Sequence, residues 1–494
     1  MRSSKIFFVT IFILSSYFLF RLIDQSQMIS VFPIDNHAND YSGHIVKLFF
    51  LEQYGYHQQV PNWYNGAYTL LSFYPPLWYL MTYPIYKLTH DTELTGYLSL
   101  LLLYLFGFIF IYLFGKEVKL SRLKRVLFSL FFFVNPIAIG YFLRLGKLPE
   151  MLGWVWVFLI AFIVFHYKER KLDKGIYWLV PLYTLLLYTH ILVFVVATLF
   201  LLMLFFSRKH RQERFMLFFC GILILLTTAY FWFPFLQSSH QNLTPSYLPL
   251  QWLIQAGNLT DKIVAFILPA LFWILFFLYW KSKDKKKEEL IFFLVPLVFS
   301  FLYFTRIAVF LPFFNRPAPD SYHFFFIFLM CYFFLSLDFE KFKQKTKNIL
   351  LYGLLCIICF GILLSILFTP FFEPHSPEIK ETFALFPYVE GRLMLVGVPT
   401  TVNRPAAYSY GAIYYNISTP AGWEALNVSL AYQDSLSNPK RALDAKDCTQ
   451  LRESLARLKT TNIISFVPYC SFIESCNFTL IKKKERACLY MQDL

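Results

Sequence analysis

The most informative shortage in this 494-residue sequence is of charge. Only 15% of the residues are Asp, Glu, Lys or Arg, whereas 57% are hydrophobic and 21% are aromatic. A water-soluble chain of this length needs far more charged surface to stay dispersed, so a large soluble protein is excluded. Nucleotide-binding signatures are missing too, since neither a Walker loop nor a G-x-G-x-x-G pattern occurs, and no internal repeat is visible.

Acidic residues are scarcer than basic ones, and the formal net charge is +15. This excess does not indicate nucleic-acid binding, because the Lys and Arg residues cluster in short tracts between hydrophobic segments, where they anchor topology. With the N-terminus inside, the basic tracts all fall on the cytoplasmic side, and the opposite loops carry far fewer cations. The tracts are 116–125, 166–174, 207–214, 281–287 and 340–347. The sequence therefore predicts a multi-pass membrane protein with a cytoplasmic N-terminus.

Long hydrophobic runs take the place of charge, and about 20 apolar residues suffice for one helix to cross a bilayer. We predict about eleven spanning helices from these runs. They lie near 5–22, 94–115, 125–143, 151–167, 176–189, 191–207, 215–236, 262–280, 289–304, 323–337 and 348–369. The first is interpreted as an uncleaved span, because no small-residue cleavage site follows it. A twelfth apolar stretch, 68–89, would place the basic tracts outside if it crossed. We predict that it is an interfacial or re-entrant part of the first outer loop, 24–93.

The composition changes after about Thr369. Residues 370–494 contain strand-like pieces and an amphipathic helix near 449–459, so we predict a small α+β domain outside the membrane, following a transmembrane domain over 1–369. Four cysteines in an oxidising compartment allow up to two disulfides, with three pairings open, and four free thiols are the alternative. These cysteines are Cys448, Cys470, Cys476 and Cys488. Five glycosylation sequons also fall outside in this topology: Asn242, Asn258, Asn416, Asn427 and Asn477.

Ionisable residues gather on the predicted outer side. Asp40, His44 and Lys47 share one face of a helix predicted from about Asp40 to Tyr54, although a merely solvated loop helix would look the same. Further candidates are Arg144, Lys147 and Glu150 in the second outer loop, His190 between two spans, and Arg316 in the segment 305–325. Interfacial anchoring is the alternative for the second-loop cations, and a structural hydrogen bond is the alternative for His190. Together, these cations suit a phosphate and the carboxylates suit a proton, which favours a lipid-linked anion as substrate.

Several short motifs resemble the GT-C superfamily of membrane glycosyltransferases. They are Asp40-Tyr41-Ser42-Gly43-His44, Pro61-Asn62-Trp63, Gly66 and Tyr74-Pro75-Pro76-Leu77. The stretches 144–150, 189–190 and 458–467 are similar to one branch, the membrane proteins labelled 6-pyruvoyl-tetrahydropterin-synthase-related, which look like glycosyltransferases despite that label. The resemblance spans most of the chain. It implies an all-α, GT-C-like membrane protein with a small α+β domain, in the plasma membrane of a prokaryote.

The resemblance also implies a reaction. A sugar would pass from a polyprenyl-phosphate donor to a glycan, protein or lipid acceptor on the non-cytoplasmic side. The first-loop acid would be the base, here Asp40, with Asp35 as the second choice. We expect inverting transfer with Asp40 and His44 in the catalytic group. Arg144, Lys147, His190 or Arg316 would stabilise the phosphate, and Glu150 would orient a cation.

Three alternatives stay open at this point. The paired-acid patterns of some GT-C branches are absent, so a divalent metal held by Asp35, His37, Asp40 and His44 is a less favoured hypothesis. A transporter or flippase of a lipid-linked saccharide would need similar cations. Transporters usually place ionisable residues near the midplane on broken or repeated helices, whereas the span interiors here are almost free of charge. An inactive scaffold whose outer domain binds a partner is the third alternative.

Overall fold

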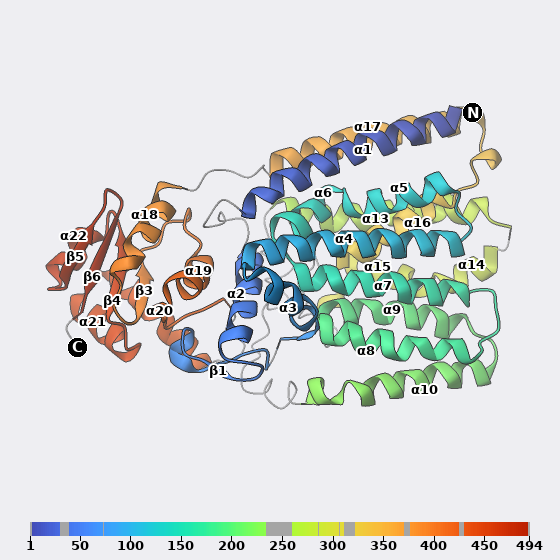
Figure 1. Ribbon diagram of the computed structural model, residues 1–494. Helices are drawn as coiled ribbons and strands as arrows, with labels where there is room; N and C mark the ends of the chain where they lie inside the picture. The colour runs from blue at the N-terminus through green and yellow to red at the C-terminus, as the bar shows by residue number, and fades with distance from the viewer. Residues whose placement is uncertain are drawn as a thin grey trace.

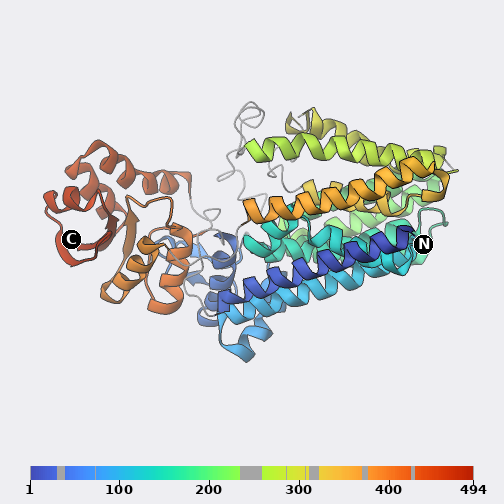
Figure 2. The ribbon, with the colours of Figure 1, turned by 90° about the horizontal axis from the view of Figure 1, so that it is seen from above.

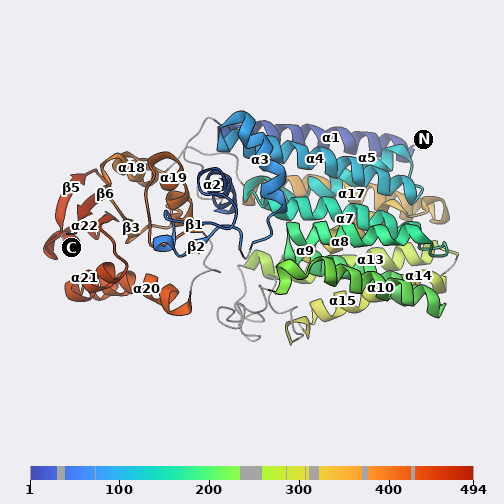
Figure 3. The ribbon, with the colours of Figure 1, turned by 60° about the horizontal axis from the view of Figure 1, so that its bottom comes forward.

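The structure, a computed structural model, describes residues 2–29, 39–72, 74–233, 259–284, 286–305, 307–310, 322–369, 376–423 and 429–492. A bundle of long helices forms one end of the molecule and a smaller unit with a β-sheet forms the other (Figure 1). The view from above shows the same arrangement, with the N-terminus at the bundle end that lies away from the sheet (Figure 2). Helix α2 (Asn39–Gln53) lies between the two parts, across the direction of the bundle helices (Figures 1 and 3).

The described parts of all eleven predicted spans are helical. The helices are α1 (Arg2–Gln25), α4 (Thr92–Glu117), α5 (Arg122–Phe133), α7 (Leu148–His166), α8 (Leu179–Thr189), α9 (Ile191–Ser207), α10 (Arg211–Thr227), α13 (Leu259–Ser282), α14 (Lys286–Phe292), α15 (Leu294–Phe304), α16 (His323–Leu335) and α17 (Gln344–Phe368). By length and composition, four described helices can cross a membrane, or five if one bent pair is a single span. The number of about eleven spans therefore stays a prediction.

The bent pair shows how the sequence breaks a helix. Helix α5 ends at Phe133, and the short helix α6 (Pro136–Ala138) begins after Asn135, whose side-chain oxygen accepts a hydrogen bond from the Ala138 N–H at 3.0 Å. Pro136 has no N–H to continue the preceding helix, but it fits the first position of a new one. The π-helical turn η3 (Ile139–Arg144) follows, and the two halves meet at 51°. After this bend, the second outer loop contacts the N-terminal end of α2, where the Tyr41 N–H donates to the Leu145 carbonyl.

The apolar stretch 68–89 does not form one straight helix. It contains the two-residue strand β2 (Tyr68–Thr69), which pairs with β1 (Gln59–Val60), and helix α3 (Leu77–Thr89), which begins after Pro75-Pro76. The break at Tyr74-Pro75-Pro76 agrees with the expectation that this stretch is not one straight helix. Its interfacial or re-entrant location stays a prediction.

Phenylalanine side chains make up much of the bundle core. Helix α16 lies in the middle and is buried along nearly its whole length. Its Phe328 contacts Phe132 of α5 and Phe158 of α7, and the rings of Phe132 and Phe158 meet edge to face at 4.9 Å. Such pairs interlock without any polar group, which suits helices whose outer faces are also apolar. The core thus fixes the end of α7 that carries Glu150.

The C-terminal unit contains a four-stranded mixed sheet in the order β3-β4-β6-β5. Strands β3 (Leu393–Val396) and β4 (Asn462–Phe466) are parallel, whereas β6 (Ala487–Met491) runs antiparallel to β4 and to β5 (Thr479–Lys483). The other elements are helices α18 (Pro377–Leu385), α19 (Arg404–Tyr415), α20 (Leu430–Ala445), α21 (Cys448–Arg457) and α22 (Cys470–Ser475). The strands and the amphipathic helix match the predicted pieces. The boundary at 369 stays a prediction, since 370–375 lie outside the described residues.

Two disulfides close the C-terminal unit. Cys448 pairs with Cys476 and Cys470 with Cys488, which resolves the three pairings that the sequence left open. Sequons Asn416 and Asn477 are described and both are exposed, whereas Asn242, Asn258 and Asn427 lie outside the described residues. The location of this unit outside the membrane stays a prediction.

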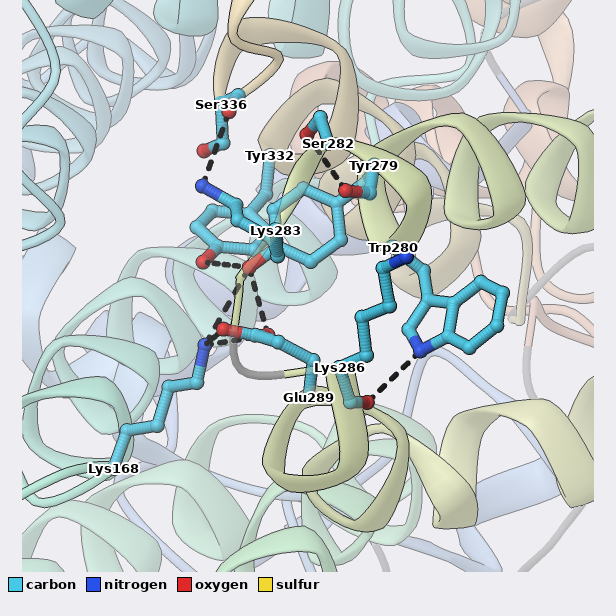
Figure 4. Close-up of polar contacts among 9 residues, drawn as sticks. All are labelled: Lys168, Tyr279, Trp280, Ser282, Lys283, Lys286, Glu289, Tyr332 and Ser336. Carbon is cyan, nitrogen blue, oxygen red and sulfur yellow. Dashed lines mark hydrogen bonds and ion pairs between the residues drawn. The ribbon is translucent and has the colours of Figure 1, made fainter.

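A buried ion pair joins the helices at the opposite end of the bundle (Figure 4). The Lys168 ammonium lies 2.6 Å from Glu289 Oε1, and the two side chains are only 13% and 8% exposed. Tyr279 donates a hydrogen bond to Glu289 Oε2 at 2.8 Å. This group fastens the loop after α7 to α13 and α14.

Removing one partner of this pair leaves the other buried without compensation. We expect Lys168→Met to lower the free energy of unfolding by about 3–5 kcal/mol, and the double variant K168M/E289Q to recover part of that loss. Thermal unfolding of the purified protein in detergent measures both. Equal unfolding temperatures for K168M and the wild type would contradict this role.

The disulfide assignment predicts a peptide map. Digestion under non-reducing conditions is expected to yield linked peptides containing Cys448 with Cys476 and Cys470 with Cys488, and any other linkage refutes the pairing. Replacing Cys448 and Cys476 by Ser opens a loop of 28 residues. The free energy of unfolding should fall by about 2–4 kcal/mol.

Candidate functional site

The candidate site includes the N-terminal end of α2, which is hydrogen-bonded to the second outer loop (140–152). The Tyr41 N–H donates to the Leu145 carbonyl at 3.1 Å, and the Tyr41 hydroxyl donates to the Glu93 carbonyl at 3.0 Å. Gly146 has φ = +70° and lies against the Tyr41 side chain, where a Cβ would not fit. A glycine is needed there both for its backbone conformation and for this close approach. This contact brings Asp40 beside the loop that carries Lys147.

Asp40 is the acid of this face, and it is partly buried. Burial raises the pKa of its carboxyl above the ordinary value, while the charges of Lys147 and Lys47 and a hydrogen-bonding interaction with the Trp423 side chain act in the opposite direction. Asp40, His44 and Lys47 are spaced by four and three residues, so one helical face presents all three. The prediction that they share a face is confirmed, and this face is covered by other parts of the chain.

His44 is held in a fixed orientation. Its side chain is 1% exposed, and Nδ1 lies 2.8 Å from the Tyr79 hydroxyl on α3. Burial lowers the pKa of His44 well below the ordinary value, and electrostatic interactions with Lys47, His190 and Lys147 act in the same direction. A lowered pKa favours the neutral imidazole, and the contact with Tyr79 holds α2 against α3.

Lys147 and Glu150 form a second polar pair whose charges interact with that of Asp40. Lys147 Nζ lies 3.9 Å from Glu150 Oε2 and 3.9 Å from the centre of the Tyr141 ring. Three nearby polar atoms are buried without a hydrogen-bond partner among the described residues: Tyr141 OH, Glu150 Oε1 and Trp154 Nε1. Glu150 and Trp154 are four residues apart on α7 and so share a face. Buried polar atoms normally have a hydrogen-bond partner, so these three atoms could accept or donate to another polar group.

His190 joins this group electrostatically and also has a structural role. It lies between α8 and α9, and its Nδ1 accepts a hydrogen bond from the Val193 N–H at 3.4 Å, which caps α9. Burial lowers the pKa of His190 to about 3, which favours its neutral form at neutral pH. The sequence left two roles open for His190, a phosphate-binding residue or a structural hydrogen-bonding residue. The hydrogen bond from Val193 shows the structural role.

Arg144 is 5% exposed at the end of the π-helical turn, three residues before Lys147. Its role at a phosphate stays a prediction. Arg316 lies outside the described residues, as do Asp35 and His37 of the metal hypothesis. In the part of the chain that the structure describes, no three His, Cys, Asp or Glu side chains are grouped to hold a metal ion.

Sequence reasoning missed one site residue and gave no role to another. Trp423 comes from the C-terminal unit, about 380 positions from Asp40, and no local pattern signals its place. Lys47 is fully buried, with its ammonium 4.1 Å from the centre of the Tyr74 ring and 4.6 Å from that of Trp423. A lysine enclosed by aromatic rings is stabilised by cation–π attraction. The sequence placed Lys47 on the correct face but could not show what surrounds it.

A cavity of about 340 Å³ lies elsewhere, at the carboxyl ends of β3 and β4. Its lining includes Arg404, Lys440 and Asp444, of which the last two are exposed, and none of the residues around Asp40 lines it. The chemistry-bearing side chains therefore gather away from this cavity.

The comparisons with known proteins bear on the fold. No family model matches the chain, and no curated protein matches it in sequence. Solved structures do match. An oligosaccharyltransferase of Archaeoglobus fulgidus aligns over 92% of this chain and 70% of its own, with 9% identity and a TM-score of 0.58. The chain shares the fold of GT-C glycosyltransferases.

Two further structures carry the same fold. The arabinofuranosyltransferase AftD from Mycobacteria aligns over 97% of this chain but only 39% of its own, with 13% identity and a TM-score of 0.53. The Archaeoglobus fulgidus enzyme AglB in complex with an inhibitory peptide and a dolichol-phosphate gives a TM-score of 0.52 at 9% identity over 92% of this chain and 69% of its own. Together with the apolar helices, this fold makes the chain a membrane protein. At such identities, activity and substrate do not transfer with the fold.

The raised pKa of Asp40 predicts a stability effect. Burial disfavours the charged form of the Asp40 carboxyl in the folded protein, so its pKa is higher in the folded than in the unfolded state. Its contribution to the free energy of unfolding is therefore fully present at low pH and is lost as the pH rises through the folded-state pKa. At neutral pH, Asp40→Asn should therefore leave the unfolding temperature unchanged or raise it. A fall of several degrees in the thermal unfolding of the detergent-solubilised variant would show that the Asp40 charge is structural.

Proposed function

We propose that this chain is a membrane glycosyltransferase that moves a sugar from a polyprenyl-phosphate donor to an acceptor on the non-cytoplasmic side. The observation that carries the proposal is that Asp40 lies on α2 at one end of a bundle with this fold, where the charges of Lys147 and Lys47 act on its carboxyl. A carboxylate beside cations is the pairing that sugar transfer from a phosphate requires, since one group takes a proton and the others stabilise a leaving anion.

The proposed reaction is a single displacement with inversion. The acceptor hydroxyl oxygen attacks the anomeric carbon as its proton passes to the Asp40 carboxylate. The bond between the anomeric carbon and the phosphate oxygen breaks, and the phosphate leaves with the electron pair on the opposite face of the sugar. Lys147 is placed to stabilise this phosphate, with Arg144, His190 and Arg316 as further candidates. Glu150 holds Lys147 in position at 3.9 Å.

The unpartnered polar atoms support a substrate at this place. Tyr141 and Glu150 contact Lys147, and Tyr141 OH and Glu150 Oε1 are buried without partners among the described residues, as is Trp154 Nε1 one turn further along α7. Hydroxyls of a sugar or oxygens of a phosphate would satisfy them. His44 belongs to the same group as a neutral orienting residue, bonded to Tyr79.

The proposal also includes the branch, the location and the acceptor. The branch is the one labelled 6-pyruvoyl-tetrahydropterin-synthase-related, the location is the plasma membrane of a prokaryote, and the acceptor is a glycan, a protein or a lipid. The oligosaccharyltransferase neighbour carries an acceptor peptide in one structure and a dolichol-phosphate in another, which supports a lipid-linked donor and a separate acceptor here. The neighbours named here are transferases, so they give the transporter alternative no support.

Asp40→Asn tests the base directly. We expect transfer to fall by about 10²–10⁴-fold, the usual contribution of a general base, while undecaprenyl phosphate binds as in the wild type. The assay supplies radiolabelled polyprenyl-phosphate sugars and membrane acceptors to the protein in nanodiscs. Asp434→Asn, an exposed acid on α20, is the matched control. Near-normal turnover in D40N would remove Asp40 from the mechanism.

The pH profile gives a second test. The base must be ionised, so transfer is present above the pKa of Asp40 and is lost as the pH falls through it. Because burial raises this pKa, the acid limb should lie above about 3.9, the pKa of an ordinary aspartate. A profile flat to that pH contradicts a buried base.

A further inference from the structure

Trp423 of the C-terminal unit reaches the face of α2 that carries Asp40, His44 and Lys47. Its ring meets the His44 ring edge to face at 4.9 Å, and Lys47 Nζ lies 4.6 Å from its centre. The Trp423 side chain also acts on the Asp40 carboxyl, whose pKa it lowers. One side chain from the far part of the sequence thus packs against His44 and Lys47 on the face that carries Asp40.

Helix α2 makes room for this ring at Gly43. A Cβ added at Gly43 would overlap the indole of Trp423. Glycine inside a helix is less favourable than alanine, and the approach of the indole accounts for its presence here. The Asp-x-x-Gly-His part of the first-loop motif therefore contains an acid and the space for the ring that contacts it.

The segment that presents Trp423 is fastened to the first outer loop. The Thr419 N–H donates to the Asn62 carbonyl at 2.8 Å, and Asn62 Nδ2 donates to the Ile417 carbonyl at 3.3 Å. Gly422 packs against the Trp63 ring, where a Cβ would not fit. The Pro61-Asn62-Trp63 motif, which the reaction itself leaves without a role, is thus the anchor of segment 416–423.

We propose that Trp423 is a positioning residue for Asp40, so that the C-terminal unit completes the active site. The inference rests on the proposed function. The indole N–H donates to one carboxylate oxygen and leaves the other for the acceptor proton, while the ring covers Lys47 and His44. Two features fix this geometry. Gly43 leaves space for the indole, and hydrogen bonds between Asn62 and segment 416–423 hold that segment in place.

Trp423→Phe keeps an aromatic ring and removes the N–H. We expect kcat to fall by about 10- to 100-fold, the loss expected for one hydrogen bond to a charged group, with undecaprenyl phosphate binding within about two-fold of the wild type. The indole stabilises the ionised carboxylate, so its loss should also move the acid limb to higher pH. Trp178→Phe is the matched control, because Trp178 precedes α8, far along the chain from this face, and is 67% exposed. Its acid limb should stay in place.

Gly43→Ala tests the same contact from the other side. The added methyl group should displace the indole and give the W423F phenotype, whereas Gly353→Ala, with no atom within 4 Å of its added Cβ, should behave as the wild type. If Gly43→Ala acts through Trp423, the double variant G43A/W423F should be no worse than W423F alone. Additive losses would mean that Gly43 acts by another route.

A measurement without substrate separates this inference from the proposed function. The pH at which Asp40 titrates is obtained from the difference in unfolding temperature between the wild type and D40N, and again between W423F and W423F/D40N. A higher titration pH in the W423F background supports the contact, and an unchanged one overturns it. If D40N is inactive while W423F matches the wild type in kcat and acid limb, Trp423 does not position Asp40, but Asp40 remains the proposed base. If D40N transfers sugar at the wild-type rate, Asp40 is not the base.

Discussion

The arrangement of the whole site depends on the docking of α2 across the end of the bundle. A helix that carries Asp40, His44 and Lys47 is expensive to bury, because each polar group loses water. The cost is offset by partners from every side: Tyr79 for His44, aromatic rings for Lys47, and Lys147 and Trp423 for Asp40. Without the hydrogen bonds of Tyr41 to Leu145 and Glu93, this face would turn to water as an ordinary amphipathic helix.

The same constraint explains why two glycines lie at the docking surface. Gly146 lets the second outer loop approach Tyr41, and Gly43 lets the indole of Trp423 approach α2. Close packing of backbone against side chain leaves no room for a methyl group at either position. The bundle supplies a rigid support, and the loops and the C-terminal unit supply the polar groups.

Hydrogen bonds connect the N-terminal part of the sequence to the C-terminal unit beside the candidate site. Glu93 at the start of α4 accepts a hydrogen bond from the Tyr414 hydroxyl at 2.6 Å, and Asn62 holds the segment before Trp423. These contacts join the C-terminal unit to the first outer loop and to the start of α4.

The sequence by itself determined the membrane class, the positions of the helices and the shared face of Asp40, His44 and Lys47, because hydropathy and helical periodicity are local properties of the chain. It also determined the strands and the amphipathic helix of the C-terminal unit. Only the tertiary structure decided that the charge of Lys147 acts on Asp40, that Trp423 packs against His44 and Lys47, and which cysteines pair. Those facts rest on contacts between residues up to hundreds of positions apart, and no local pattern encodes which distant side chain fills a given space. The neutral state of His44 was likewise decided by burial, which arises only when the helices pack.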